Sequence, residues 1–180
     1  MILWIIIIAA CVILDQLTKW IVINSMELYE SIILIPKVFS FTYIRNYGAA
    51  WGMFSNHRWI FILVTSIALI IMPIILYRYR KVHALFSLSL SLFIGGALGN
   101  LIDRVFVGYV VDFLEFTFID FPVFNVADIC VVFGAGFMIV YALFFDKTFF
   151  VDKKPVAVST NTEEDIVNDG TNQKNDNDGN

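Results

Sequence analysis

The chain has 180 residues, of which 59% are hydrophobic and only 16% are charged, and its formal net charge is −4. So much apolar surface and so little charge exclude an ordinary soluble domain. The negative balance also gives no reason to expect a nucleic-acid partner. The composition therefore predicts an integral membrane protein.

Four apolar stretches follow one another along the chain, each close to the roughly 20 residues that a helix needs to cross about 30 Å of hydrocarbon. They cover residues 1–23, 59–77, 84–104 and 125–145. We expect an all-α membrane protein in which these four transmembrane helices form one bundle. Residues 1–150 would then make up a single integral membrane domain.

The first stretch contains residues 8–11, Ile-Ala-Ala-Cys, which resemble the cleavage site of a lipoprotein precursor. A signal peptide would begin with basic residues, but no Lys or Arg precedes the apolar run, which continues to Ile23. We therefore interpret this stretch as a membrane-spanning helix. Because Cys11 and Cys130 lie in separate apolar helices, we expect neither a reactive thiolate nor a disulfide.

Basic residues favour one side of the predicted membrane domain. They crowd the turn between the second and third helices and follow the fourth helix: Arg78, Arg80, Lys81, Lys147, Lys153 and Lys154. The positive-inside rule then places both termini in the cytoplasm and the two longer loops outside. Lys37, Arg45 and Arg58, in the first of these loops, reduce the difference in Lys and Arg content between the two sides. Residues 151–180 are acidic and poor in apolar residues, so we expect a disordered cytoplasmic tail.

The two outer loops carry patterns of their own. Residues 39–43 alternate apolar with polar side chains, which predicts a half-buried strand in a small extracytoplasmic cradle of β-strands. Aromatic residues recur through residues 106–124, which is typical of an interfacial loop or helix at the headgroup level. Residues 46–52 offer an amide, small residues and an aromatic ring, and we expect them to form the lip of a ligand site.

Polar side chains also occur inside the apolar stretches, where each ionisable group costs roughly 2.5–3.5 kcal/mol on insertion scales. These residues are Asp15, Lys19, Asn100, Asp103, Arg104, Asn125 and Asp128. Asp15 and Lys19 are four residues apart, Asp103 and Arg104 follow Asn100 by three and four residues, and Asn125 and Asp128 are three apart, so each group shares one helix face. Counted along the helices, all of them reach the outer half of the membrane. We therefore expect one polar layer near the outer surface.

The residue types in this layer limit the chemistry. The two histidines, His57 and His83, are predicted on opposite sides of the membrane, which argues against a zinc site. A Ser–Lys hydrolase using Lys19 is disfavoured because no serine lies on a recognisable nucleophile turn. Carboxylates are in surplus: Asp103, Asp112, Glu115, Asp120 and Asp128. Two that share one proton could activate water without a metal or cofactor, as in aspartic proteases, but the residues alone do not choose the pair.

Simpler interpretations stay open for the same residues. Two ion pairs, Asp15 with Lys19 and Asp103 with Arg104, could serve only to stabilise the fold. The side chains of Asn100 and Asn125 could form hydrogen bonds between helices or cap helix ends. Glycines in the third and fourth helices, Gly95, Gly96, Gly99, Gly134 and Gly136, are expected to allow close packing. Two other functions are a small ion- or proton-coupled transporter subunit and a non-enzymatic assembly factor that binds a partner through the outer loops. The absence of an inverted repeat disfavours the transporter.

Five short motifs occur in order along the chain. They are Asp15-Gln-Leu-Thr-Lys19, Asn46-Tyr-Gly-Ala-Ala-Trp-Gly52, Gly95-Gly-Ala-Leu-Gly-Asn-Leu-Ile-Asp-Arg104, Val110-Val-Asp-Phe113 and Phe124-Asn-Val-Ala-Asp128. Together they resemble the motifs of the bacterial lipoprotein signal peptidases, or signal peptidase II. The resemblance runs from about residue 1 to residue 147.

The resemblance implies an aspartic endopeptidase of the bacterial plasma membrane that acts near the outer leaflet surface. It would cut diacylglyceryl-modified prolipoproteins on the N-terminal side of the lipidated cysteine, contacting membrane lipids, without a cofactor or metal. It also implies a monomer that globomycin-type inhibitors block. By the motif match, Asp112 and Asp128 correspond to the catalytic pair. The supporting and substrate-binding positions are Asp15, Lys19, Asn46, Gly48, Asn100, Asp103, Arg104, Asn125 and Ala127.

Overall fold

The computed structural model describes residues 1–48 and 57–146. The expected tail at 151–180, and residues 49–52 of the expected lip, lie outside the described residues. In chain order the elements are α1 (Ile2–Ser25), β1 (Ser31–Ile35), β2 (Phe39–Asn46), α2 (Arg58–Tyr79), α3 (Ala84–Ile102), a π-helical turn η2 (Asp103–Val107), β3 (Val110–Phe116) and α4 (Val126–Phe144).

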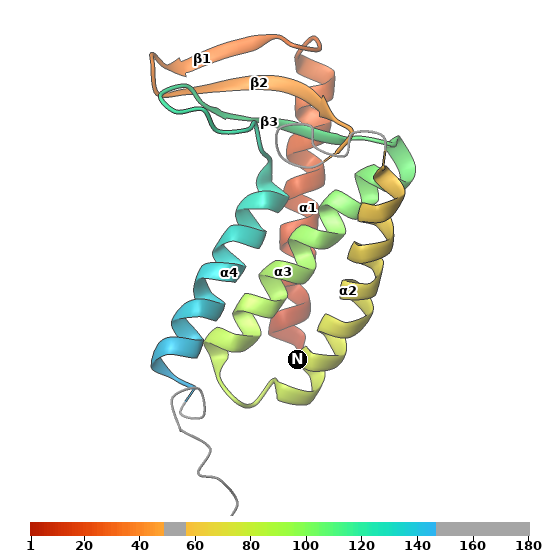
Figure 1. The fold of residues 1–180 in the computed structure, drawn as a ribbon, viewed down its shortest axis with the longest axis vertical. Coiled ribbons are helices and arrows are strands. Elements are labelled where there is room, and N and C mark those ends of the chain that lie inside the picture. The colour runs from red at the N-terminus through yellow and green to blue at the C-terminus, as the bar shows by residue number, and fades with distance from the viewer. Residues whose placement is uncertain (49–56, 147–180) are drawn as a thin grey trace, which may run out of the picture. The chain divides into compact units, whose positions relative to one another are not determined.

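The expected bundle of four apolar helices is confirmed within the described residues. Each helix is long and apolar enough to cross a membrane, and the span that begins with α3 continues through η2 to Val107. Asn125 is the N-cap of α4 rather than its first helical residue. The helices lie side by side, and the sheet covers the end of the bundle away from the N-terminus (Figure 1).

Helix α1 turns its polar residues inward. Its buried side chains, Cys11, Asp15, Lys19 and Val22, are spaced by three or four residues and share one face. The apolar residues on the rest of the helix, such as Trp20, are exposed. A helix in water would bury the apolar face instead. This inverted pattern suits a helix whose exterior contacts lipid.

Helix α3 packs against the other three helices, with glycines at the closest approaches. A Cβ added at Gly95 would lie 2.5 Å from the Cβ of Cys11 on α1, and one at Gly96 would collide with the Ala127 carbonyl on α4. On α4, Gly134 abuts Ser89 and Phe93. The expectation of close packing is wrong for Gly136, because a Cβ there would meet no atom within 4 Å.

The strands form the predicted cradle, an antiparallel sheet of order β1-β2-β3. The expected strand at 39–43 extends to Asn46 as β2, and the loop after η2 contributes β3, whose Asp112 pairs with Ile44. Backbone groups at an apolar interface need partners, and pairing with β2 supplies them. A buried cluster of Val22, Tyr43, Val111 and Phe113 fixes the sheet onto α1.

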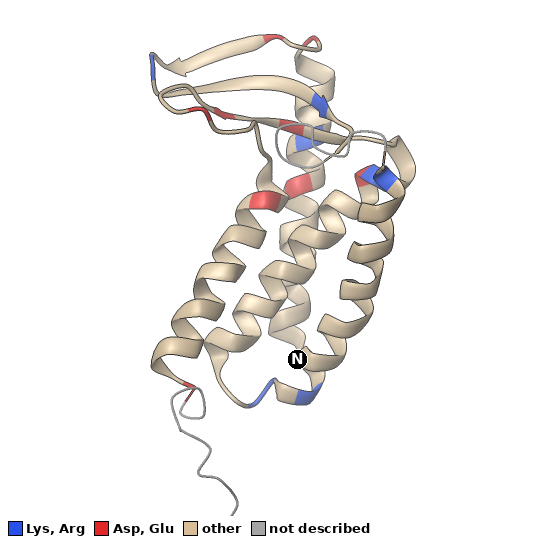
Figure 2. Ribbon diagram, in the orientation of Figure 1, with Lys and Arg blue, Asp and Glu red and all other residues tan. Residues whose placement is uncertain are grey.

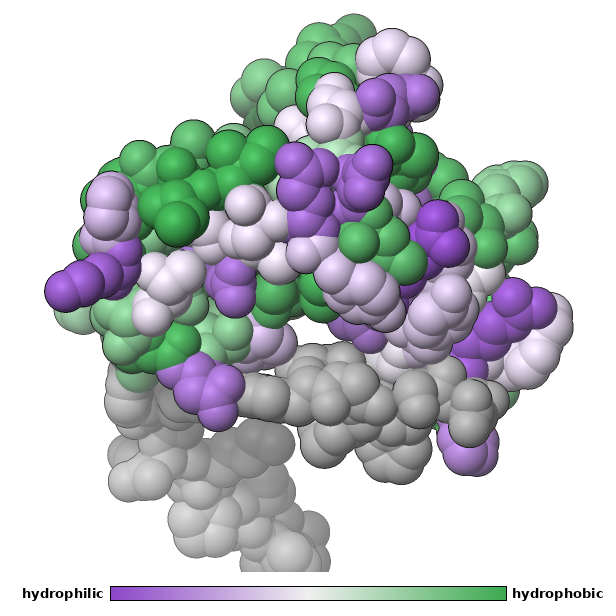
Figure 3. All heavy atoms as spheres, turned by 90° about the horizontal axis from the view of Figure 1, so that it is seen from above, coloured by the Kyte–Doolittle hydropathy of each residue, from purple (hydrophilic) through white to green (hydrophobic). Residues whose placement is uncertain are grey.

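Charged residues in the described part lie near the two ends of the bundle and not along its middle (Figure 2). One group is in the sheet and at its junction with the helices, and another lies in the turn that joins α2 to α3 (Figure 2). On the sheet face, hydrophilic side chains gather near the centre with hydrophobic side chains beside them (Figure 3). The uncharged middle matches the hydrocarbon layer of a bilayer.

Candidate active site

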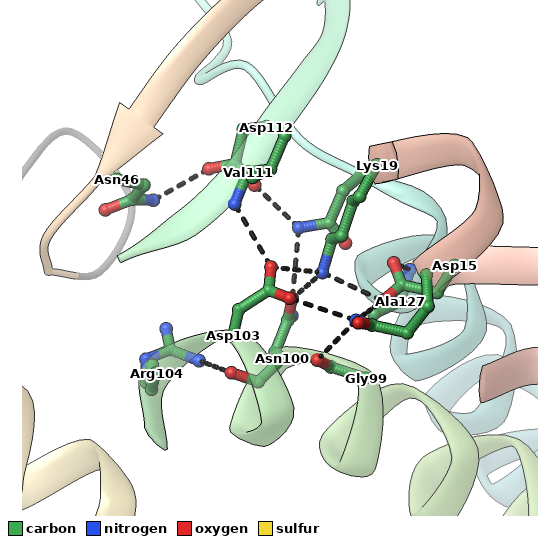
Figure 4. A network of polar contacts seen from close by, with 12 residues as sticks. Asp15, Lys19, Asn46, Gly99, Asn100, Asp103, Arg104, Val111, Asp112 and Ala127 are labelled. Carbon is green, nitrogen blue, oxygen red and sulfur yellow. Dashed lines mark hydrogen bonds and ion pairs between the residues drawn. The ribbon is translucent and has the colours of Figure 1, made fainter. Parts of the chain in front are cut away.

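Polar side chains from helices and strands meet where the sheet joins the bundle (Figure 4). We call this group the polar layer. Its members come from α1, β2, α3, η2, β3 and the start of α4: Asp15, Gln16, Lys19, Asn46, Asn100, Asp103, Arg104, Asp112, Asn125 and Asp128. Every buried side-chain nitrogen or oxygen in residues 1–48 and 57–146 has a hydrogen-bond partner, as buried polar groups require.

Lys19 is the centre of the polar layer. Its Nζ lies 2.8 Å from Asp15 Oδ2 and 2.9 Å from Asp103 Oδ2, and it donates to Asn100 Oδ1 at 2.9 Å. All three charged side chains are buried. An unpaired charge at such a site would be expensive, so the two carboxylates depend on this one ammonium group.

Asp15 also joins α1 to α4. Its Oδ1 accepts the backbone N–H of Ala127 at 2.9 Å, in the first turn of α4. The neighbouring Gln16 donates to Asp103 Oδ1 at 2.9 Å and to the Gly99 carbonyl at 3.2 Å. Sequence reasoning missed Gln16, although it lies inside the first of the five motifs. The glutamine thus adds a second link between α1 and the end of α3.

The π-helical turn orients the side chain of Asp103 toward strand β3. Gly108 ends the turn with a left-handed φ of 93° and donates its N–H to the Asp103 carbonyl at 2.9 Å. The Asp103 carboxylate accepts the N–H of Val111 at 3.2 Å, one residue before Asp112. Such π-turns often occur at functional sites. Here the turn fixes the start of β3, and with it the position of Asp112.

Asn125 connects Asp112 with Asp128. Its Nδ2 donates to Asp112 Oδ1 at 2.6 Å, while its Oδ1 accepts the N–H of Asp128 at 3.0 Å. The Asn125 N–H in turn donates to Asp128 Oδ2 at 3.2 Å, which completes a capping box. One residue therefore positions both carboxyl groups, one from β3 and one from α4.

Two further amides hold the other carboxyl oxygens. Asn46 Nδ2 donates to Asp112 Oδ2 at 2.9 Å, and Asn100 Nδ2 donates to Asp128 Oδ1 at 2.8 Å. Each amide has a fixed orientation, because Asn46 Oδ1 accepts the N–H of Gly48 and Asn100 Oδ1 accepts from Lys19, which can only donate. All four oxygens of the two carboxyl groups thus accept an N–H.

Burial and the nearby negative charge of Asp128 raise the pKa of Asp112 to about 7. Hydrogen bonds from Asn46 and Asn125 lower this pKa, but they do not offset the burial. A carboxyl group with a pKa near neutrality can carry a proton at the pH at which cells work. It is therefore suited to acid–base chemistry.

A cavity of about 280 Å³ opens onto both carboxyl groups. Arg104 lines it with its guanidinium carbon 5.2 Å from the centre of the Phe61 ring, and donates to the carbonyls of Asn100 and Gly48 at 3.3 Å. The sequence could not single out Phe61, because it is an apolar residue in an apolar helix. The suggested Asp103–Arg104 pair is wrong, since Asp103 binds Lys19 instead.

The other candidate carboxylates lie elsewhere. Glu115 accepts hydrogen bonds from Ser40 and Thr42 on β2, and Asp120 is exposed in the segment after β3. Among the residues that the structure describes, no group of three or more His, Cys, Asp or Glu side chains is arranged to hold a metal ion. Of the five candidate carboxylates, all of them described residues, Asp112 and Asp128 line this cavity together.

Comparisons with known proteins agree on one family. The family model described as signal peptidase (SPase) II matches residues 7–144. A lipoprotein signal peptidase from Brevibacillus brevis is 50% identical over 137 residues, covering 76% of this chain and 92% of the relative. One from Clostridioides difficile is 45% identical over 145 residues, covering 81% and 97%.

Two solved structures, both titled as a bacterial membrane enzyme studied by the in meso method, are also similar. The first has a TM-score of 0.72 and 36% identity, and the match covers 85% of this chain and 93% of the other. The second has a TM-score of 0.69 and 36% identity, covering 79% and 93%. The fold described above is therefore similar to an experimentally solved membrane enzyme.

Proposed function

This chain belongs to the signal peptidase II family of aspartic peptidases, and we propose that it removes signal peptides from diacylglyceryl-modified prolipoproteins. The cut falls on the N-terminal side of the lipidated cysteine. One observation carries the proposal: Asp112 and Asp128 line the same cavity and are joined through Asn125. Membership in a peptidase family disfavours the transporter and assembly-factor alternatives.

The two carboxyl groups act as a proton-sharing pair. Asp112, whose pKa is about 7, holds the proton and gives it to the carbonyl oxygen of the scissile bond. Asp128 takes a proton from water, whose oxygen attacks the carbonyl carbon. When the tetrahedral intermediate collapses, the C–N bond breaks and the leaving amine receives the proton held by Asp128. As the C=O bond re-forms, a hydroxyl group of the intermediate returns its proton to Asp112, so both carboxyl groups regain their starting states. No metal or cofactor enters this scheme.

The surrounding amides preorganise the pair. Asn46, Asn100 and Asn125 hold all four carboxyl oxygens, so that neither carboxyl group rotates away from the cavity. Lys19, Asp15, Asp103 and Ala127 fix these amides and the start of α4. Arg104 lines the cavity and donates to the Gly48 carbonyl, and these two residues bind the substrate backbone.

The site faces the outer leaflet in the proposed orientation. The N-terminus, the end of α4 and the turn between α2 and α3 lie at the same end of the bundle, and this turn carries Lys and Arg (Figures 1 and 2). By the positive-inside rule, that end is cytoplasmic and the sheet end is outside. Lipid-linked substrate then reaches the cavity at the membrane surface. Monomeric action and inhibition by globomycin belong to the same proposal.

The test is cleavage of a purified diacylated prolipoprotein by the purified protein. Asp112→Asn and Asp128→Asn keep the shape of each side chain and remove the acid, so each should lower kcat by about 10²–10⁴-fold. Asp120→Asn, at an exposed acid, is the matched control and should cleave at the wild-type rate. Undiminished cleavage by either dyad variant, with helical content intact, would remove that residue from the mechanism.

A further inference from the structure

A second, apolar cavity of about 400 Å³ lies between the sheet and α4, directly beside Asp128. One wall is aromatic and comes from β2, β3 and the segment after β3. The opposite wall is the face of α4 that follows Asp128. The main lining residues are Phe39, Phe116, Phe121, Phe124, Val132 and Phe133.

The aromatic wall is packed on itself. The ring centre of Phe116 lies 5.2 Å from that of Phe124 and 5.7 Å from that of Phe39, and Phe121 meets Phe124 edge-on at 5.7 Å. Rings in such contact support one another. The wall therefore stands without a ligand, and the cavity is already formed.

The two cavities meet at Asp128. Phe121, Phe124 and Asp128 line both, but the smaller cavity also has Asn46, Asn100 and Arg104. Among the described residues, Asp128 is the only polar one that lines the larger cavity. A peptide backbone placed in the larger cavity would lose its hydrogen bonds, which is costly. The substrate backbone therefore belongs in the smaller cavity, and the larger one suits an apolar chain.

The larger cavity is accessible from the lipid side. Val132 and Phe133 line it and are also 67% and 57% exposed on the outer surface of α4. That surface belongs to a helix long and apolar enough to cross the membrane. A hydrocarbon chain can thus slide in sideways from the bilayer without crossing water.

We infer that the apolar cavity holds an acyl chain of the lipidated substrate residue while the peptide lies in the polar cavity. This rests on the proposed function, and it puts the lipidated residue on the Asp128 side of the cut. Lipid tails are as apolar as this cavity, so the cavity adds little affinity. It fixes the position of the scissile bond instead, and the effect should appear mainly in kcat.

Filling the cavity tests the assignment. Val132→Trp places a large ring at the α4 wall, and Ile139→Trp, two turns further on and 58% exposed, is the matched control outside the cavity. Both are assayed in lipid nanodiscs on one prolipoprotein peptide carrying either two palmitoyl or two butanoyl chains.

Val132→Trp should lower kcat about tenfold or more for the palmitoyl substrate and less than about twofold for the butanoyl one. Ile139→Trp should leave both rates unchanged. An equal loss on both substrates, or no loss on either, would overturn the assignment.

Photo-crosslinking tests occupancy without cleavage. The probe is the same peptide with a diazirine at the end of one palmitoyl chain, added to the Asp112→Asn variant. Labels found on residues 129–133 by mass spectrometry would support the assignment. Labels concentrated on Phe61 or elsewhere on α2 would refute it. If the wild type cleaves no substrate, the proposed function fails while this experiment still decides what the cavity binds.

Discussion

The polar layer and the half of the bundle away from the sheet, around Ser87–Ser91 and Gly134, are held together in different ways; we call the latter the inner half. In the inner half, Ser89 donates to the Gly134 carbonyl at 2.6 Å and Ser91 to the Ser87 carbonyl at 2.7 Å, so hydroxyls bind backbone. In the polar layer, side chains distant in sequence bind each other or a distant backbone group. The bonds from Lys19 to Asn100 and from Ala127 to Asp15 span 81 and 112 residues.

This difference separates what holds the helices together from what positions the chemistry. Lipid is as apolar as a leucine side chain, so helices in a membrane gain little from burying apolar surface and pack through small residues. A serine hydroxyl can find a backbone carbonyl to bind in many different arrangements of the helices. In a buried network of charges and amides, few arrangements give every group a hydrogen-bond partner. Such a network therefore fixes the relative positions of the helices and strands that carry it more tightly.

The largest effect should come from removing the charge at the centre of the polar layer. Lys19→Met leaves Asp15 and Asp103 buried without their cation, which should cost about 3–5 kcal/mol of unfolding free energy. It also removes one of the two donors that hold the Asn100 oxygen, the other being Asn125, and the Asn100 amide in turn holds Asp128, so kcat should fall by up to about 10²-fold. Thermal unfolding in detergent and the cleavage assay measure the two effects.

A double variant controls for lost packing. Lys19→Met with Asp103→Asn restores the net charge of the wild-type cluster, and it should recover part of the lost stability. If the double variant is less stable than Lys19→Met alone, charge balance is not what holds this cluster together.

The second prediction concerns pH. Because Asp112 gives up its proton at a pH of about 7, kcat/KM should fall about tenfold per pH unit above that value. The raised pKa also means that the folded state keeps a proton that the unfolded state loses above pH of about 4. Stability should therefore decline from about pH 4 to pH 7 and then level off.

Unfolding temperatures across this range check the sign of the effect. Asp112→Asn should make the decline shallower, whereas the exposed control Asp120→Asn should leave it unchanged. An identical pH dependence in wild type and Asp112→Asn would show that another group titrates.

A smaller effect is expected from packing at the edge of the polar layer. A Cβ at Gly99 would lie 2.5 Å from Asp15 Oδ2, which Lys19 holds in place, so Gly99→Ala should cost about 1–3 kcal/mol. Gly136→Ala is the matched control, because its Cβ would meet nothing within 4 Å. Equal unfolding temperatures for the two variants would contradict this account.

The smallest effect should come from the inner half. Ser89→Ala removes the hydrogen bond to Gly134 and should cost about 0.6 kcal/mol, the average for such bonds in membranes, with cleavage unchanged. A loss of activity comparable to that of Lys19→Met would mean that the inner half also positions the chemistry, and the contrast between the two regions would fail.

Part of the polar layer could be predicted before the fold was known. The spacing of Asp15 and Lys19 placed them on one helix face, and the structure shows an ion pair of 2.8 Å between them. Gln16 and Phe61 were missed for different reasons. Gln16 is an ordinary polar neighbour of Asp15, and Phe61 is one apolar residue among many, so neither stands out in a local pattern.

By itself the sequence determined the membrane class, the four helices and the presence of polar groups inside them. Length, hydropathy and helical spacing are local properties, so they can be read from neighbouring residues. Only the tertiary structure decided that Asp103 binds Lys19 rather than its neighbour Arg104, and that Asp112 shares a cavity with Asp128. These partners meet because glycines let the helices approach and because β2 aligns β3, and no local pattern records such contacts.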